Sequence, residues 1–227
     1  MKILIIEDEP EIVEVLTVAF EIRWPDVKSV YTHMGEKGVA LVESENPDIV
    51  ILDLGLPDIS GFDVLKQIRT FSDVPIIILT VRGEESDVVK GLEWGADDYM
   101  TKPFRQLELM SRVQALTRRT GSSIKEQPLT YGRLSFDPAT RQLLYGQIKI
   151  IITQTEASIL GCLIKKAGQI AAYSELAETV WGSDYPDSVN SLRVYIRRLR
   201  QKIEKDPDNP QVILTRSGVG YFLVKEG

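Results

Sequence analysis

The first half of the sequence alternates short apolar runs with longer segments of helical periodicity, and this alternation restricts the folds open to the chain. The apolar runs are KILII, SVYT, DIVILDL, VPIIILT and DDYMT, and the helical segments cover residues 10–22, 35–45, 60–71, 84–94 and 105–119. Runs that are apolar over most of their length predict strands of a parallel sheet that helices cover on both faces. We therefore expect an α/β fold, a doubly wound five-stranded parallel sheet.

The second half follows a different pattern. It begins with the strand-like pieces LTYGRLSFD and RQLLYGQIKIII, and three helical segments follow at residues 153–168, 173–181 and 188–205. Thr153 and Glu156 have the spacing of a capping box at the start of the first helix. The final stretch, VILTRSGVGYFLV, predicts a hairpin that turns at Gly218 to Gly220. Three helices and a terminal hairpin predict an α+β winged helix-turn-helix domain.

The two halves also differ in charge. Residues 1–120 hold 13 Lys and Arg against 22 Asp and Glu, whereas residues 121–227 hold 14 against 11. The stretch TGSSIKEQP between them loses periodicity and gathers small and polar residues. We therefore predict one domain at 1–120, a linker at 121–127 and a second domain at 128–227, each large enough for its own core. The positive balance of the second domain suggests a polyanionic partner.

The compartment can be inferred from what the chain lacks. No apolar run approaches the roughly 18 residues of a membrane span, and the opening MKILII meets acidic residues too soon for a signal peptide. Cys162, the single cysteine, excludes an internal disulfide. Its apolar helical surroundings favour a buried structural role over a nucleophile. We expect a soluble cytoplasmic protein without membrane contact.

Chemically active residue types stand where the predicted strands end. Glu7 and Asp8 follow the first strand, Asp53 ends the third, Thr80 ends the fourth and Lys102 follows the fifth. In a doubly wound sheet these ends meet at one edge, where ligands bind. Three carboxylates placed together require a cation, and oxygen ligands of this kind favour Mg²⁺. With an ammonium and a hydroxyl beside it, one of these carboxylates can accept a phosphoryl group.

Four motifs resemble the receiver domain of two-component response regulators, which has a flavodoxin-like fold: IEDEP, DLGLPDISGFDVL, PIIILT and GADDYMTKPF. With the second half included, the whole chain resembles the OmpR/PhoB family. The resemblance implies that a sensor histidine kinase transfers a phosphoryl group to Asp53 in the presence of Mg²⁺. It further implies that the phosphorylated chain forms a homodimer and binds double-stranded DNA to regulate transcription.

The resemblance also implies roles for single residues around Asp53. Glu7, Asp8 and Asp53, with the backbone carbonyl of Gly55, would bind the metal. Thr80 and Lys102 would bind the phosphoryl group, and Tyr99 would move when Thr80 does.

Three neighbours of these residues have other expectations. Glu9 would open the first helix, where its charge meets the helix dipole. Asp58 stands where the family often has glycine. Val81 is bulkier than the small residue usual beside the switch threonine, which could narrow the access to Asp53.

The family's dimer contacts correspond to charged positions on the fourth and fifth helices and the strand between them. These positions are Lys90, Asp97, Asp98, Glu108, Arg112 and Arg119. The expected pairs between two chains are Lys90 with Glu108, Asp98 with Arg112 and Asp97 with Arg119. Exposed pairs contribute only about 0 to 1 kcal/mol each, so their expected role is to orient a two-fold dimer.

The helix at 188–205 divides into two faces by helical phase. The apolar face consists of Leu192, Ile196, Leu199 and Ile203. The opposite face consists of Asn190, Arg193, Val194, Arg197 and Gln201, with Arg198 and Arg200 at its flanks. Such a face suits the major groove of DNA, since arginine binds guanine or phosphate, asparagine binds adenine and Val194 can contact a thymine methyl.

The terminal hairpin resembles the family's wing. Ser217 stands where many relatives carry an arginine for the minor groove, and Arg216 lies one residue earlier. Because neighbouring strand residues face opposite sides, Arg216 need not replace that arginine. The segment WGSDYPDS, residues 181–188, matches the region through which such regulators contact RNA polymerase, although an ordinary polar turn explains it equally well.

Two other functions compete with this interpretation. A phosphatase of the haloacid dehalogenase type would use Asp53 on small substrates, but it would need an aspartate two residues later, where Gly55 stands. A constitutive DNA-binding protein would use the first domain only to dimerise, and the intact acidic pocket argues against that. The only histidine, His33, stands outside any kinase-like motif, so the chain is expected to receive phosphoryl groups and not to donate them.

Overall fold

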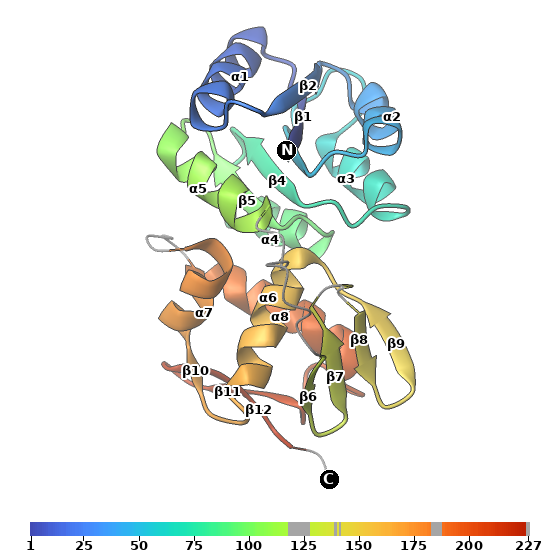
Figure 1. Cartoon of the computed structure of the whole chain (residues 1–227), viewed down its shortest axis with the longest axis vertical. Helices are drawn as coiled ribbons and strands as arrows, with labels where there is room; N and C mark the ends of the chain where they lie inside the picture. Colours follow the sequence, from blue (N-terminus) through green and yellow to red (C-terminus); the bar gives the residue numbers. More distant parts are fainter. Residues whose placement is uncertain (118–127, 139, 141, 183–187, 226–227) are drawn as a thin grey trace. The chain divides into compact units, whose positions relative to one another are not determined.

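The computed structural model describes residues 1–117, 128–138, 140, 142–182 and 188–225. The chain divides into two compact units, Met1–Thr117 and Arg118–Gly227, and each is described by itself (Figure 1). The predicted linker at 121–127, together with Arg119, lies outside the described residues.

The N-terminal unit alternates strands and helices along its whole length. Its elements are β1 (Lys2–Ile6), α1 (Pro10–Arg23), β2 (Lys28–Thr32), α2 (Gly35–Glu45), β3 (Ile49–Leu52), α3 (Gly61–Arg69), β4 (Ile76–Thr80), α4 (Glu85–Glu93), β5 (Asp98–Thr101) and α5 (Gln106–Thr117). The strands form one parallel sheet in the order β2-β1-β3-β4-β5. Helix α1 packs against α5, and α2 packs against α3. This arrangement confirms the predicted doubly wound sheet.

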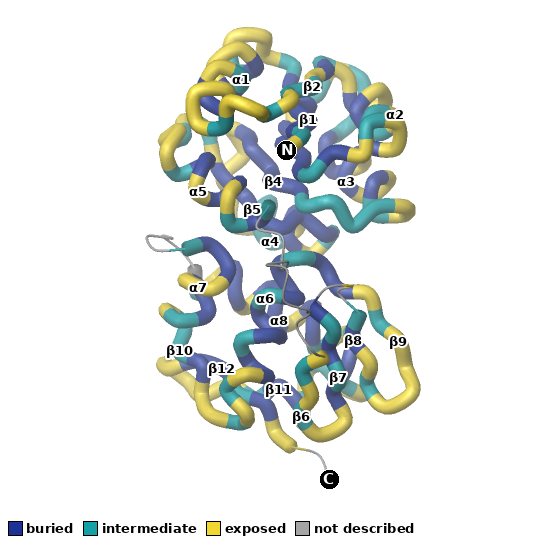
Figure 2. The backbone as a smooth tube through the Cα atoms, viewed as in Figure 1, coloured by how far each residue is buried: buried dark blue, intermediate teal, exposed yellow. Residues whose placement is uncertain are grey.

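The central strands carry the core of this unit. Every residue of β3 and β4 is buried, as is all of β1 after its first residue (Figure 2). On one face, Phe20 of α1 and Val113 of α5 pack onto Ile5 and Ile51 of the sheet. Burying a side chain of this size contributes about 1.5 to 3 kcal/mol. The continuous apolar runs of the sequence follow from this burial on both faces.

The C-terminal unit consists of two antiparallel sheets and three helices. Its elements are β6 (Leu129–Tyr131), β7 (Leu134–Asp137), β8 (Gln142–Tyr145), β9 (Ile148–Ile151), α6 (Gln154–Lys165), β10 (Ala171–Ala172), α7 (Tyr173–Trp181), α8 (Ser188–Ile203), β11 (Ile213–Arg216) and β12 (Gly220–Leu223). One sheet has the order β6-β7-β8-β9 and the other β10-β12-β11. Each strand-like piece of the sequence is a hairpin, turned at Gly132 and Gly146, whose φ angles are 57° and 63°. This is the predicted winged-helix domain.

Local signals account for the ends of several elements in this unit. The capping box forms as predicted: Glu156 N donates to Thr153 Oγ1, and Thr153 N donates to Glu156 Oε2 at 2.8 Å. Strand β10 was not predicted, because two alanines show no periodicity.

Cys162 is half-buried, and burial raises the pKa of its thiol. In the part of the chain that the structure describes, no helix has the length and apolar character needed to cross a membrane.

Candidate functional site

The carboxyl edge of the parallel sheet brings the predicted pocket residues together. Backbone hydrogen bonds extend the sheet to them: Asp53 N donates to Ile6 O at 2.9 Å, and Lys102 N donates to Thr80 O at 2.8 Å. Glu7 N likewise donates to Thr32 O at 3.0 Å. Backbone hydrogen bonds of the sheet thus position Asp53, Lys102 and Glu7 at this edge.

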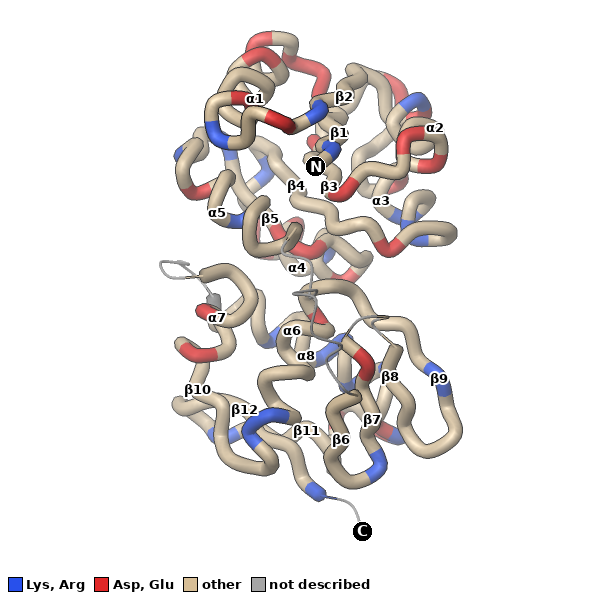
Figure 3. Tube along the Cα trace, in the orientation of Figure 1, with Lys and Arg blue, Asp and Glu red and all other residues tan. Residues whose placement is uncertain are grey.

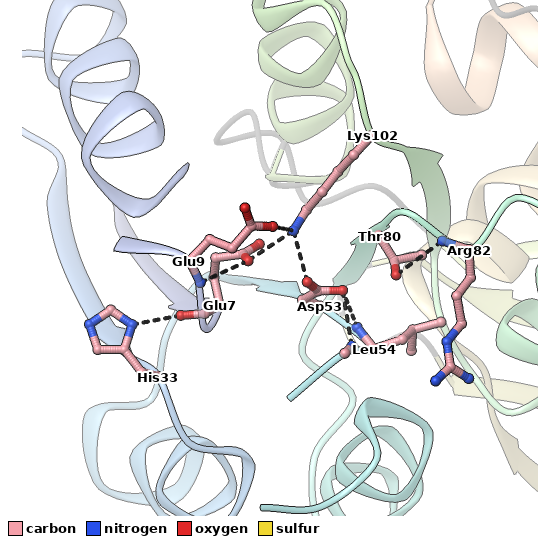
Figure 4. Close-up of polar contacts among 9 residues, drawn as sticks. Glu7, Glu9, His33, Asp53, Leu54, Thr80, Arg82 and Lys102 are labelled. Atoms are coloured by element: carbon pink, nitrogen blue, oxygen red, sulfur yellow. Dashed lines mark hydrogen bonds and ion pairs between the residues drawn. The ribbon is translucent and has the colours of Figure 1, made fainter. Parts of the chain in front are cut away.

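Lys102 lies at the centre of this pocket. Its Nζ donates to Asp53 Oδ2 and Glu7 Oε1, both at 2.8 Å, and to Glu9 Oε1 at 3.3 Å (Figure 4). Burial alone would lower the pKa of the ammonium, but the hydrogen bonds with Asp53 and Glu7 outweigh it and raise the pKa. One permanent cation is thus shared among three carboxylates.

The Asp53 carboxylate is held in its charged form. Burial acts to raise its pKa, but the hydrogen bond from Lys102, the Gly55 N–H and the Thr80 hydroxyl together lower it. Its Oδ1 accepts hydrogen bonds from Leu54 N and from Gly55 N, the latter at 3.1 Å. A buried carboxylate that stays ionised at neutral pH is suited to nucleophilic attack.

The pKa of Glu7 is raised, whereas that of Asp53 is lowered. The Glu7 side chain is 1% exposed, and burial raises its pKa to about 7, with a further increase from the charge of Asp53 and an opposing effect of the Lys102 hydrogen bond. Its Oε2 is buried and has no hydrogen-bond partner among the described residues. Burying a charged oxygen without a partner costs free energy, unless a bound ligand contacts that oxygen.

The same acids could hold a metal ion. One carboxylate oxygen from each of Glu7, Asp8, Glu9 and Asp53 lies within 4.8 Å of the others. An all-oxygen set suits Mg²⁺, which retains several waters and binds one or two carboxylates directly. The unpartnered Glu7 Oε2 and the excess of negative charge over the single ammonium both fit a divalent cation. These residues therefore fit the metal that the sequence predicts.

Two residues of the pocket have contacts that the sequence did not indicate. Glu9 is the N-cap of α1, as expected of a residue that opens this helix, but its carboxylate also pairs with Lys102. The Nδ1 of His33 lies 2.8 Å from the Glu7 carbonyl oxygen. His33 follows β2, the neighbour of β1. Its position at a strand end could therefore have indicated that it lies close to Glu7.

Thr80 and Tyr99 are linked through a single residue of the loop after β4. Arg82 N donates to Thr80 Oγ1 at 3.4 Å, while the Tyr99 hydroxyl donates to Arg82 O at 2.6 Å. Tyr99 is buried, and this burial raises its pKa. A Cβ added to Gly91 of α4 would lie 3.1 Å from the Tyr99 ring. Space on α4 thus permits the inward position of Tyr99.

Asp58 and Val81, the two residues near Asp53 that depart from the family pattern, lie in different surroundings. Asp58 accepts hydrogen bonds from Gly35 N at 2.8 Å and Glu36 N at 2.9 Å, so it caps α2 from the loop after β3. Val81 is 71% exposed beside the pocket.

Gly61 must be glycine, since a Cβ there would lie 2.1 Å from Asp53 O.

The residues of the expected dimer face are partly used within one chain. Asp97 and Asp98 are both fully buried. Arg69 binds Asp97 at 2.9 Å, and Arg112 binds Asp98 at 2.8 Å. Both carboxylates thus have partners within the chain, and their pairing with a second chain stays a prediction.

The other residues of this face remain near the surface. Lys90 is exposed, and its Nζ lies 4.7 Å from the centre of the Phe62 ring and 4.6 Å from that of Trp94. Glu108 is partly exposed and pairs with Arg112 of its own helix.

The predicted faces of α8 are confirmed at some positions and corrected at two. Asn190, Arg193 and Arg197 are exposed, as expected. Val194 and Arg198, however, are each only 8% exposed. The helix contacts both α6 and α7, so its buried surface is wider than the stripe that helical phase alone predicts.

The remaining cations near the hairpin also divide by exposure. Arg200 donates to Ile213 O through Nη2 at 2.8 Å and to Thr215 Oγ1 at 2.9 Å, so it binds the first strand of the wing. Arg216 and Ser217 are exposed at the hairpin tip. Most of the segment at 181–188, the predicted contact region for RNA polymerase, lies outside the described residues.

A groove of about 420 Å³ lies between α8 and the wing, and its lining is rich in arginine. Arg193, Arg197 and Arg200 contribute to it from α8, and Ser217 and Gly218 from the wing. A concave basic surface beside an exposed helix face is suited to the phosphates of a nucleic acid.

The comparisons with known families agree with both parts of this geometry. Residues 3–114 match the response regulator receiver domain, and residues 147–223 match the family described as transcriptional regulatory protein, C terminal. The transcriptional regulatory protein KdpE of Mycobacterium tuberculosis is 39% identical over 221 residues, which cover 96% of this chain and 97% of the relative. The DNA-binding response regulator MtrA of Mycolicibacterium smegmatis is 40% identical over 221 residues, 97% and 95% of the two chains.

Solved structures show the same arrangement of elements. DrrB of Thermotoga maritima, described as an OmpR/PhoB homolog, is 30% identical with a TM-score of 0.52 and coverage of 98% of both chains. A RitR mutant matches with a TM-score of 0.77 over 99% of both chains at 23% identity, which concerns the fold alone. The chain therefore belongs to the OmpR/PhoB family of two-component response regulators, the phosphorylation-dependent transcriptional regulators that join a receiver domain to a DNA-binding domain.

Proposed function

We propose that Asp53 is the residue that receives the phosphoryl group, and that a sensor histidine kinase supplies it. The observation that carries this proposal is the arrangement around Asp53: an ionised carboxylate bound by Lys102, beside an acidic cluster with an unpartnered oxygen. The covalent chemistry proposed for the chain is limited to phosphorylation of Asp53 and later hydrolysis. In hydrolysis, water attacks phosphorus and the Asp53 carboxylate leaves.

The roles of the pocket residues follow from their chemistry. The Asp53 carboxylate forms a bond to phosphorus while the bond from phosphorus to the kinase histidine nitrogen breaks, and that nitrogen keeps the electron pair. The Lys102 ammonium can move from carboxylate oxygens to a phosphoryl oxygen, and the Thr80 hydroxyl can donate to another. Glu7 and Asp8, with the Gly55 carbonyl, would hold Mg²⁺. When bound, the metal neutralises charge on the phosphoryl oxygens.

A coupling between phosphorylation and the opposite edge of the receiver is supported by the contacts of Arg82. Phosphorylation replaces the single charge of the Asp53 carboxylate with a phosphoryl group that carries about 1.5 to 2 negative charges. A Thr80 hydroxyl drawn toward these charges leaves the N–H of Arg82, whose carbonyl binds the Tyr99 hydroxyl. We propose that Thr80 and Tyr99 change together because they bind one loop residue.

Phosphorylation is proposed to promote a homodimer through α4, β5 and α5. Among the described residues expected at this face, Lys90 is exposed and Glu108 is partly exposed, and Arg112 pairs with Glu108 and Asp98. Sedimentation of the full chain with and without a phosphoryl mimic tests this step. We expect a larger dimer fraction with the mimic, and an unchanged monomer would contradict the proposal.

The C-terminal domain is proposed to bind tandem half-sites in double-stranded DNA. Asn190, Arg193 and Arg197 are the exposed residues of α8 for this role, with Arg216 on the wing. RNA polymerase is proposed as a further partner through the segment at 181–188. Since the target is chromosomal DNA, we place the protein in the cytoplasm.

Phosphoryl incorporation into the purified full-length chain tests the first proposal. With acetyl phosphate and Mg²⁺, intact mass should show one added phosphoryl group on the wild type and none on Asp53→Asn. Asp58→Asn is the matched control, because it removes a carboxylate from the same loop without touching the pocket. Incorporation into Asp53→Asn at the wild-type level would refute the assignment. Turnover of small phosphorylated substrates without a labelled chain would instead favour the phosphatase alternative.

A further inference from the structure

The five cations of α8 divide into two groups that the sequence does not distinguish. Arg193 and Arg197 are exposed, whereas Arg198, Arg200 and Lys202 bind groups of their own domain. Figure 3 shows how Lys and Arg positions are distributed over α8 and the neighbouring elements. The inward group raises the question of which residue holds it there.

A single buried carboxylate accounts for two of the three inward cations. Glu156, in the first turn of α6, is fully buried. Arg198 Nε lies 3.1 Å from its Oε1, and Lys202 Nζ lies 2.6 Å from its Oε2. The same Oε2 accepts the hydrogen bond from Thr153 N at 2.8 Å, and Lys202 also donates to Ile151 O at 3.2 Å. The capping carboxylate of α6 is thus also the anchor of α8.

This anchor constrains α8 in two ways. Arg198 and Lys202 are four residues apart and so lie on one side of the helix, one turn above the other. Two contacts at different heights limit both rotation of α8 about its axis and sliding along it. Because successive residues differ by about 100° around a helix, rotation of α8 about its axis would move Arg197 away from the exposed face as it brought Arg198 toward that face.

The same C-terminal part of α8 is also fixed to the wing, through Arg200 and through Glu204 just after the helix. Arg200 donates to Ile213 O, and Glu204, one turn later, accepts from Ile213 N at 2.8 Å. The wing and α8 therefore move together. Any contact that orients α8 on α6 consequently orients the wing as well.

We propose that Glu156 is a positioning residue for DNA binding: by holding Arg198 and Lys202 inward, it determines which face of α8 meets the DNA. This inference rests on the proposed DNA-binding function. It assigns Arg193 and Arg197 to contact with DNA and excludes Arg198 and Lys202 from that contact. Loss of the anchor then reduces discrimination between DNA sequences, while the exposed arginines continue to attract phosphates.

The salt dependence of binding distinguishes a positioning residue from a phosphate contact. The logarithm of the binding constant falls with the logarithm of the salt concentration, with a slope of about 0.9 per phosphate contact. We would compare a duplex selected from a random pool by the wild-type full-length chain with a scrambled duplex of the same composition. Binding would be measured by fluorescence anisotropy over a series of salt concentrations.

Four variants give the expected pattern. Arg197→Gln should lower the slope by about 0.9 on both duplexes. Arg198→Gln and Lys202→Gln should leave the slope unchanged. Glu156→Gln should lower the ratio of selected to scrambled affinity about tenfold, the equivalent of about 1.4 kcal/mol, without lowering the slope. Lys202→Gln should also lower the ratio of selected to scrambled affinity, because it removes one of the two contacts between α8 and the Glu156 anchor.

Three results would overturn the inference or separate it from the proposed function. A slope reduced by one contact in Arg198→Gln or Lys202→Gln would show that these cations meet phosphate, and would refute it. An unchanged affinity ratio in folded Glu156→Gln would also refute it. If circular dichroism shows that Glu156→Gln is unfolded, Lys202→Gln decides, since Arg198 keeps its partner there. If the wild type selects no duplex, DNA binding itself fails, and the inference with it.

Discussion

Each unit buries carboxylates beside a lysine, but the balance of charge differs between the two places. At the sheet edge, the ammonium of Lys102 faces the carboxylates of Glu7, Glu9 and Asp53. At the start of α6, the single carboxylate of Glu156 faces Arg198, Lys202 and a backbone N–H. Acids are in excess in the first cluster and cations in the second.

The difference distinguishes the proposed metal site from the proposed anchor of α8. In the first cluster, Glu7 Oε2 has no hydrogen-bond partner among the described residues, and the pKa of Glu7 is raised to about 7. A bound cation would give this oxygen a partner and would lower the pKa of Glu7. In the second cluster, Glu156 Oε2 accepts hydrogen bonds from Lys202 Nζ and Thr153 N, while Oε1, which likewise has no hydrogen-bond partner among the described residues, lies 3.1 Å from Arg198 Nε. Removing a partner should therefore disrupt the second cluster, whereas the first should gain stability when charge is removed or a cation is added.

The largest effect is expected for Glu156→Gln. Arg198 would remain buried beside a neutral amide, and breaking a buried pair in this way costs about 3 to 5 kcal/mol. Urea unfolding followed through the tryptophans should show this loss in free energy of unfolding. Glu175→Gln is the control, because its pair with Lys166 is exposed and should contribute at most about 1 kcal/mol. Equal losses in the two variants would end the distinction between a buried anchor and a surface pair.

Magnesium should stabilise the N-terminal unit. At a concentration of about 100 times its dissociation constant, a ligand that binds only the folded state adds about 2.7 kcal/mol. Thermal unfolding in Mg²⁺ and in EDTA measures this difference. Asp8→Asn should abolish most of the effect, while Asp26→Asn, outside the acidic cluster, should keep it. A wild type that is indifferent to Mg²⁺ would contradict the metal assignment.

The pKa of Glu7 should appear as a pH dependence of stability in the absence of metal. Because the folded-state value of about 7 exceeds the ordinary value of 4.5, the folded protein binds more protons between these values. Stability should therefore fall as pH rises from about 4.5 to 7. Glu7→Gln removes this loss and should be more stable than the wild type at pH 8, by on the order of 2 kcal/mol.

Urea unfolding in EDTA at pH 5 and pH 8 provides the measurement for Glu7→Gln. The two proteins should be close in stability at the lower pH and diverge at the higher one. A variant that is less stable than the wild type at pH 8 would mean that Glu7 is satisfied by its present contacts. The contrast with Glu156 would then disappear.

The smallest effect is expected for Asp58→Ala. This carboxylate caps α2, and loss of such a cap costs about 1 kcal/mol. The hydrogen bonds to Gly35 and Glu36 outweigh burial and lower the pKa of Asp58, so its contribution is present above its unfolded pKa and is lost as pH falls through the folded value. Thermal unfolding at neutral and acidic pH tests both statements. Asp63→Ala serves as the exposed comparison, and an equal loss there would argue against the cap.

The sheet and its pocket were predictable because both depend on local patterns. Continuous apolar runs identified the strands, and their ends placed Asp53, Thr80 and Lys102 at one edge. The prediction did not extend to the bond between Lys102 and Glu9, since Glu9 was assigned to the helix alone. Which side chains of a strand-end loop meet is decided by rotamers and not by sequence spacing.

The face of α8 was harder to predict because it packs against more than one element. Helical phase placed Arg198 at the flank of the exposed face, but α6 covers that side through Glu156. A glutamate in a capping box is expected to bond the backbone, and nothing in its own helix indicates a partner far along the chain. The partners of Asp97 and Asp98 within the chain were missed for a similar reason, because Arg69 and Arg112 reach them only in the folded unit.

The central claim is that phosphorylation of Asp53 controls DNA binding. Its most direct test is genome-wide recovery of bound DNA from cells under inducing conditions, with the wild-type chain and with Asp53→Ala at equal abundance. The account predicts that the wild type occupies a defined set of sites and that the variant loses most of that occupancy. Identical occupancy by the two proteins would contradict it.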